Sequence, residues 1–206
     1  MSFSDRFEWS LEMQSRHALD YYREYFDIED IIQIDSVADQ NKELKSMDYS
    51  GLDTVLYNAR GLPIHVAQRF RMKYYDKNED KYCEPDFSLR YVSYDGETSE
   101  YEKLKKAHKH QHVSPPSIYA FGITEYGRQP AVTNGFESFF LIDLHKFLRR
   151  HLEHGWLTEL EVTPNGDGSE GIYFSLEDLQ QSGCILKSWG SNHQLYNGSA
   201  EVSINE

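Results

Sequence analysis

The spacing of hydrophobic residues changes period along the chain, and this change separates predicted helices from predicted strands. In residues 7–26 the apolar positions recur at helical intervals, which predicts an amphipathic helix. Residues 54–57 and 64–67 are short apolar runs of strand length. The turn-forming residues 58–61 lie between them and include a glycine. Two apolar runs joined by a short glycine-containing segment predict a β-hairpin.

The rest of the chain predicts further elements that pack around this hairpin. Strands are predicted at residues 87–94, 117–124 and 136–142, with a last hairpin at 157–162 and 171–174. Helices are predicted at residues 99–112, at 144–153 after the capping residue Asp143, and after the capping residue Ser175. Residues 28–34 fit either a helical turn or an edge strand, and residues 35–46 are polar enough to be a loop or linker. We therefore expect an α/β fold with a central mixed β-sheet flanked by helices.

Chain length and composition limit the protein to a few broad classes. At 206 residues, the chain is long enough for one domain with a sizeable core. We expect that core at about residues 7–182, with a docked C-terminal end and a tail in residues 183–206. A hydrophobic content of 39% and an aromatic content of 14% exclude wholesale disorder. No apolar run approaches the ~18 residues of a membrane span, and the polar N-terminal segment is not typical of a secretory signal.

Cysteine usage and charge refine this picture. Cys83 and Cys184 are the only cysteines, and so few thiols predict reduced side chains in a cytoplasmic protein. The formal net charge of −13 argues against a general nucleic-acid coat, which would be basic. The same charge is compatible with a nuclease that has a local basic cleft, and with an acidic surface that binds another protein.

An unusual group of polar residues lies at one end of the predicted hairpin. Asp53 immediately precedes the first apolar run, and Gln68, Arg69 and Arg71 directly follow the second. Because opposed residues of a strand pair lie about 5 Å apart, Asp53 can meet this polar group across the hairpin. Strand alternation places Arg69 and Arg71 on one face, and Gln68 and Phe70 on the other.

This layout resembles the PD-(D/E)XK superfamily, whose members have the restriction-endonuclease-like fold. The resemblance covers about residues 15–150. There, an aspartate near the start of one hairpin strand faces an acid-x-lysine at the end of the next. Asp53 matches the aspartate, whereas Gln68 stands where an acid is usual, and Arg69 or Arg71 stands where lysine is usual.

The resemblance also implies a cofactor and a reaction. It implies metal-dependent hydrolysis of a phosphodiester, with Mg²⁺ held by Asp53 and helped by Gln68 or Asp86. Glu24 is the candidate acid from the first helix, since the resembling fold often takes a ligand from there. An arginine in place of the lysine can stabilise negative charge but cannot act as a general base.

Two further segments are candidates for nucleic-acid contact. The predicted helix 99–112 is the most basic part of the chain, which makes its lysines candidates for phosphate binding: Lys103, Lys105, Lys106 and Lys109. Arg90 is expected beside the hairpin site. His108, His110 and His112 fit either a metal site or a solvent-exposed helix end. Residues 73–85 fit an exposed loop, or a substrate-facing loop whose tyrosines stack bases among lysines.

Three functions remain open from the sequence. The first is a Mg²⁺-dependent nuclease, which loses activity when Asp53 is replaced. The second is a nucleic-acid-binding module that keeps a nuclease-like fold without chemistry. The third is an acidic protein of a phage or mobile element that binds another protein and no nucleic acid.

Overall fold

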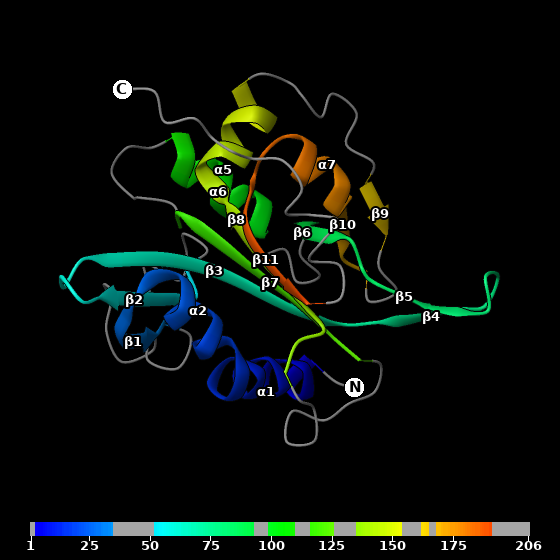
Figure 1. Cartoon of the computed structure of the whole chain (residues 1–206). Coiled ribbons are helices and arrows are strands. Elements are labelled where there is room, and N and C mark those ends of the chain that lie inside the picture. Colours follow the sequence, from blue (N-terminus) through cyan, green and yellow to red (C-terminus); the bar gives the residue numbers. More distant parts are fainter. Residues whose placement is uncertain are drawn as a thin grey trace.

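A mixed six-stranded β-sheet forms the centre of the protein (Figure 1). The computed structural model describes residues 3–34, 52–92, 99–109, 116–125, 135–153, 162–164 and 168–190. Within them the strand order is β1-β2-β3-β7-β8-β11. These strands are β1 (Ile28–Gln33), β2 (Thr54–Asn58), β3 (Pro63–Met72), β7 (Ile118–Thr124), β8 (Ser138–Asp143) and β11 (Ile185–Gly190). β3 and β7 are parallel and the other neighbours are antiparallel, so the predicted α/β class with a mixed sheet is confirmed.

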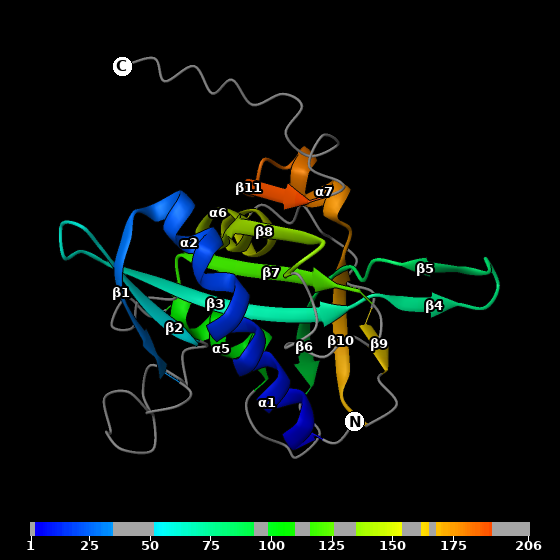
Figure 2. The same cartoon turned by 60° about the horizontal axis from the view of Figure 1, so that its bottom comes forward.

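The N-terminal helical segment covers one face of this sheet, as both views show (Figures 1 and 2). It consists of α1 (Phe3–Met13), the π-helical turn η1 (Gln14–Ala18) and α2 (Leu19–Phe26), so the helix begins four residues before the predicted start. The apolar stripe of the helix packs under the hairpin in one buried cluster. Its members include Trp9, Met13, Ala18 and Tyr22 from the helix, and Leu56, Val66 and Phe70 from β2 and β3.

The opposite face carries the remaining helices and a second, smaller sheet. The helices are α5 (Glu100–Lys109), α6 (Leu144–Leu148) with the π-helical turn η3 (Arg149–Glu153), and α7 (Leu176–Gln181). The second sheet has the order β6-β10-β9, with β6 (Phe87–Val92), β10 (Glu170–Phe174) and β9 (Val162–Pro164). The predicted N-caps are confirmed: Asp143 and Ser175 accept hydrogen bonds from the backbone N–H groups of Lys146 and Asp178.

Several expectations from the sequence need correction. The third predicted strand, now β6, pairs with β10 and lies outside the central sheet, although Phe87 and Leu89 do share its buried face. Residues 185–190 form the sixth strand of the central sheet, so the apolar packing unit extends beyond residue 182. Of the two alternatives for residues 28–34, the edge strand is the one that forms, as β1 (Ile28–Gln33).

Residues 73–85 are more ordered than a loop. They contain β4 (Tyr74–Asp76) and β5 (Lys81–Cys83), which pair antiparallel. Cys83 and Cys184 are free thiols. Among the helices that the structure describes, none has the length and apolar character needed to cross a membrane. The predictions for residues 35–46 and for His110 and His112 lie outside the described residues, as does the side chain of His108.

Candidate functional site

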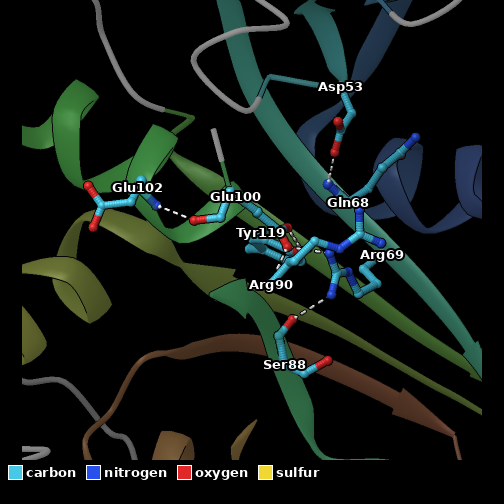
Figure 3. Close-up of polar contacts among 9 residues, drawn as sticks. Asp53, Gln68, Arg69, Ser88, Arg90, Glu100, Glu102 and Tyr119 are labelled. Atoms are coloured by element: carbon cyan, nitrogen blue, oxygen red, sulfur yellow. Dashed lines mark hydrogen bonds and ion pairs between the residues drawn. The ribbon is translucent and has the colours of Figure 1, made fainter. Parts of the chain in front are cut away.

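Asp53 lies where β2 and β3 separate, and its carboxylate completes their hydrogen bonding. The register of the pair ends at Thr54 opposite Val66, and the N–H of Asp53 donates to the carbonyl of Val66 at 3.1 Å. Beyond this point β2 offers β3 no further backbone partner. The Oδ2 atom of Asp53 accepts a hydrogen bond from the backbone N–H of Gln68 at 2.5 Å (Figure 3). Asp53 therefore faces the polar end of β3, where it satisfies a buried donor.

Gln68 projects toward the helices, on the other face from the arginines. Its Oε1 atom accepts a hydrogen bond from the hydroxyl of Tyr22 at 3.2 Å. Burial, with a smaller contribution from the charge of Asp53, raises the pKa of Tyr22 far above its ordinary value, so the phenol stays protonated as a donor. The register between β3 and β7 is continuous through these positions. The predicted placement of Gln68 and the arginines on opposite faces is thus confirmed.

Arg69 lies at the centre of a polar network on the face that carries α5. Its guanidinium donates to the carbonyl of Ser88 at 3.1 Å and forms an ion pair with Glu100 (Figure 3). The Glu100 carboxylate also accepts a hydrogen bond from the hydroxyl of Tyr119 and another from the backbone N–H of Arg90, the second at 3.1 Å. The network therefore ties together β3, β6, β7 and α5.

Charge and burial explain why this network holds its protonation states. Burial would lower the pKa of Arg69, but the charge of Glu100, together with smaller contributions from Tyr119, Asp53 and Tyr173, outweighs burial and raises that pKa above the ordinary value. Burial also raises the pKa of Tyr119, which keeps its hydroxyl a donor to Glu100. Arg69 and Tyr119 therefore both stay protonated and both donate to the carboxylate of Glu100.

Lys73 is the third cation on this face and also has acidic partners. It directly follows β3, and its backbone N–H donates to the carbonyl of Thr124 at 2.9 Å, which continues the alternation of the strand. Its ammonium group forms an ion pair with Glu137 and lies 3.8 Å from a carboxylate oxygen of Glu84. The positive charge of Lys73 is therefore neutralised within the fold.

Arg71 lies between these two satisfied cations and differs from both. It is partly buried and makes no hydrogen bond or ion pair with any residue that the structure describes. Burial, together with the neighbouring charge of Arg69, lowers the pKa of Arg71 to about 10. The side chain is still protonated at neutral pH, so β3 presents a positive charge that forms no ion pair with a described residue, although the charge of Glu100 acts on it.

The three candidate metal ligands are not brought together. Glu24 accepts a hydrogen bond from the indole N–H of Trp189 in β11 at 2.8 Å. β11 and β2 are four strand spacings apart, about 19 Å, so Glu24 is remote from Asp53. Asp86 precedes β6. Its partial burial raises its pKa, and the negative charge of Asp178 contributes less in the same direction. Among the described residues, no three Asp, Glu, His or Cys side chains group to hold a metal ion.

The predicted basic helix forms, but part of its charge is neutralised locally. In α5, the ammonium of Lys105 contacts Glu102 at 3.2 Å and lies 5.4 Å from the ring centre of Tyr101. Lys106 is exposed, Lys103 is partly buried, and the side chain of Lys109 lies outside the described residues. Arg90 reaches the site through its backbone N–H, which binds Glu100.

Glu100 and Tyr119 are the functional residues that the sequence did not single out. Glu100 stands in the first turn of a helix, where acids are common, so it has no distinctive local signal. Tyr119 is a polar-tipped residue in a strand whose residues are all buried, and this burial is the hint that its hydroxyl needs a partner.

The comparisons with known proteins were negative: no family model, curated protein or solved structure matches the chain. The chemistry of the site therefore has to support any functional proposal by itself.

Proposed function

We propose that the protein binds nucleic acid on a scaffold of the restriction-endonuclease-like type, and that it does so without hydrolysing it. The observation that supports this proposal is the row of cations on one face of β3. Its outer members, Arg69 and Lys73, have acidic partners, whereas Arg71 between them has none among the described residues. A partly buried guanidinium in this position is suited to an anion from outside the chain.

A phosphodiester is the anion that fits this site best. The planar guanidinium presents paired donors that match two oxygens of a phosphate, and arginine is less strongly hydrated than lysine. The remainder of the chain is acidic, with a net charge of −13, so a polyanion gains attraction only at local basic positions. Lys106, exposed on α5, is a further candidate for phosphate contact.

The arrangement around Asp53 favours binding over catalysis. Its carboxylate already accepts a hydrogen bond from the backbone of Gln68, and Gln68 itself projects to the opposite face. Glu100 is engaged by Arg69 and Tyr119. Arginine at the lysine position cannot take a proton from water near neutral pH. Hydrolysis with Mg²⁺ on Asp53 remains the competing proposal, and it makes opposite predictions.

The scaffold assignment is part of the proposal. Three features support it: an N-terminal helix, an antiparallel hairpin whose acid faces the polar end of the next strand, and a parallel neighbour of that strand reached through a helix. The first helix and the hairpin are the parts that the resemblance had implied.

The test measures binding and cleavage in the same samples. Fluorescence anisotropy with labelled DNA and RNA, single-stranded and duplex, is recorded for the wild type, Arg71→Gln and the control Arg60→Gln, with EDTA or with Mg²⁺. Arg60 is an exposed arginine on the turn at the other end of β3. We expect binding that ignores EDTA, a loss of about tenfold or more for Arg71→Gln, and no loss for the control.

Three results would overturn the proposal. They are an absence of binding by the wild type, equal affinities of the wild type and Arg71→Gln, and cleavage that requires Mg²⁺ and disappears in Asp53→Ala. The last result would establish the competing nuclease.

A further inference from the structure

The hairpin of β4 and β5 projects from the body of the protein as a narrow arm. Both views show it extending well beyond the end of the central sheet (Figures 1 and 2). Within the described residues, the two strands pair only with each other. The arm exposes three aromatic side chains, with exposed fractions of 50% for Tyr74, 42% for Tyr75 and 56% for Tyr82. Such a concentration of exposed rings is uncommon on a surface that has no ligand.

The register of the arm fixes how these rings are displayed. Tyr75 is opposite Tyr82, and their ring centres lie 5.2 Å apart at an angle of 61°. The hydroxyl of Tyr75 also donates to Asp80, which holds that ring in place. Tyr74 is opposite Cys83 and therefore lies on the other face of the arm. One face thus carries a preformed pair of rings, and the other carries a single ring.

The acidic residues of the arm are occupied by internal contacts. The carboxylate of Asp76 accepts hydrogen bonds from the backbone N–H groups of Asn78 and Glu79, at 2.8 and 3.4 Å. Glu79 forms an ion pair with Lys81, and Asp80 holds the hydroxyl of Tyr75. Lys77, at the tip, has no ion pair among the described residues. The arm therefore presents rings and an ammonium group, while its carboxylates are held within the turn.

The arm also begins near Arg71, the cation that forms no ion pair with a described residue. Tyr74 is three residues after Arg71 along almost continuous strand, a separation of about 10 Å. Lys73, between them, is fixed to Glu137 and Glu84, so the base of the arm is anchored to the sheet. A nucleic-acid backbone that binds Arg71 can therefore extend toward the tyrosines of the arm.

We propose that the arm binds the bases of single-stranded nucleic acid by stacking on Tyr75 and Tyr82, while Arg71 binds the backbone. This inference rests on the proposed function and names the form of the ligand. In a duplex the bases stack on one another and their faces are closed to the rings, whereas a single strand offers them. Stacking uses a face that every base has, so the site tolerates different sequences.

The experiment compares a labelled single strand of thymidine nucleotides, such as (dT)15, with a duplex of the same length. Anisotropy is measured for the wild type, Tyr75→Ala/Tyr82→Ala, Tyr75→Phe/Tyr82→Phe and Leu62→Ala. Leu62 is an equally exposed residue on the turn at the far end of β3. We expect the alanine pair to lose affinity for the single strand by about tenfold or more, and the phenylalanine pair and the control to keep it.

A second measurement does not depend on whether the alanine variant folds. A single strand that contains 5-iodouracil is cross-linked to the wild type with ultraviolet light, and the site is found by mass spectrometry. We expect cross-links at Tyr75 or Tyr82. Cross-links confined to other segments would overturn the inference.

The outcomes separate this inference from the function on which it rests. If the wild type binds nucleic acid and the alanine pair binds the single strand equally well, the arm inference fails and the proposed function stands. If the wild type binds no nucleic acid, both fail. If the alanine pair converts a dimer to a monomer in sedimentation with unchanged affinity, the arm joins two copies of the chain and the inference is overturned.

Discussion

The two faces of β3 have the same backbone but opposite chemistry. On the face covered by α1 and α2, Val66 and Phe70 are buried in an apolar cluster, and the amide of Gln68 accepts a hydrogen bond from Tyr22. On the other face, Arg69, Arg71 and the following Lys73 form a row of cations. The first face leaves no charge to be neutralised, whereas the second carries three.

The difference separates the cations that join parts of the fold from one that does not. Arg69 and Lys73 each have an acid supplied by a distant element, Glu100 and Glu137, so they help to join the parts of the fold. Arg71 has no such acid among the described residues and raises electrostatic repulsion with Arg69. We infer that the outer cations stabilise the fold and that the middle one is kept for a ligand. Mutations on each face can test that division.

The largest effect is expected at the buried ion pair. Arg69→Met leaves the carboxylate of Glu100 partly buried without its cation, and this costs about 3 kcal/mol or more in the free energy of unfolding. Urea denaturation measures it. Arg69→Met/Glu100→Leu should recover much of the loss, because both charges are then removed. A cost for Arg71→Met as large as that for Arg69→Met would contradict the division between outer and middle cations.

A smaller effect is expected on the helix-covered face. Tyr22→Phe removes the hydroxyl that donates to Gln68 and leaves a buried amide oxygen without that partner. We expect a loss of about 1–2 kcal/mol in the free energy of unfolding. The affinity for nucleic acid should stay unchanged, since the proposed binding site lies on the other face of β3. A variant that folds normally but binds more weakly would show that the two faces are coupled.

The smallest effect is the loss of folding stability at acid pH, and it arises at His151, on the same side of the sheet as the cation row. His151 is buried against Tyr101, Phe147 and Phe174, and its Nδ1 atom has no hydrogen-bond partner among the described residues. Burial, and secondarily the charge of Lys105, lower the pKa of His151. The unfolded chain therefore binds the proton more readily, and stability should fall as the pH drops below about 6.5.

The control for this effect is His151→Phe, which keeps a ring in the aromatic cluster. Its unfolding free energy should decline less steeply between pH 7 and pH 5 than that of the wild type. His65, whose pKa burial also lowers, accounts for part of the slope that remains. Identical slopes in the two proteins would show that the imidazole of His151 is not the titrating group.

Local patterns predicted much of this arrangement. Strand alternation alone placed Gln68 on the other face of β3 from the arginines. The turn residues set the register that brings Asp53 to β3. The helix caps at Asp143 and Ser175 were predictable because each side chain accepts a hydrogen bond from the first turn of the helix that it precedes. Each of these features depends on contacts within a few residues or across one tight turn, which is why the sequence reveals them.

The rest depends on contacts between distant segments. Periodicity predicted a strand at residues 87–94, but not that β6 pairs with β10 instead of joining the central sheet. Glu100 could be placed in a helix, but not opposite Arg69, because the path of the chain between them decides that meeting. Glu24 was the candidate acid from the first helix, yet its carboxylate accepts a hydrogen bond from Trp189 of a distant segment.

The salt dependence of nucleic-acid binding tests the central claim most directly. Each phosphate contact releases condensed counterions, so affinity falls with salt in proportion to the number of contacts. Log affinity falls as log salt concentration rises, and the magnitude of this slope should be smaller by about one in Arg71→Gln than in the wild type, and unchanged in Arg60→Gln. Equal slopes for the wild type and Arg71→Gln would mean that Arg71 binds no phosphate, which would contradict the account.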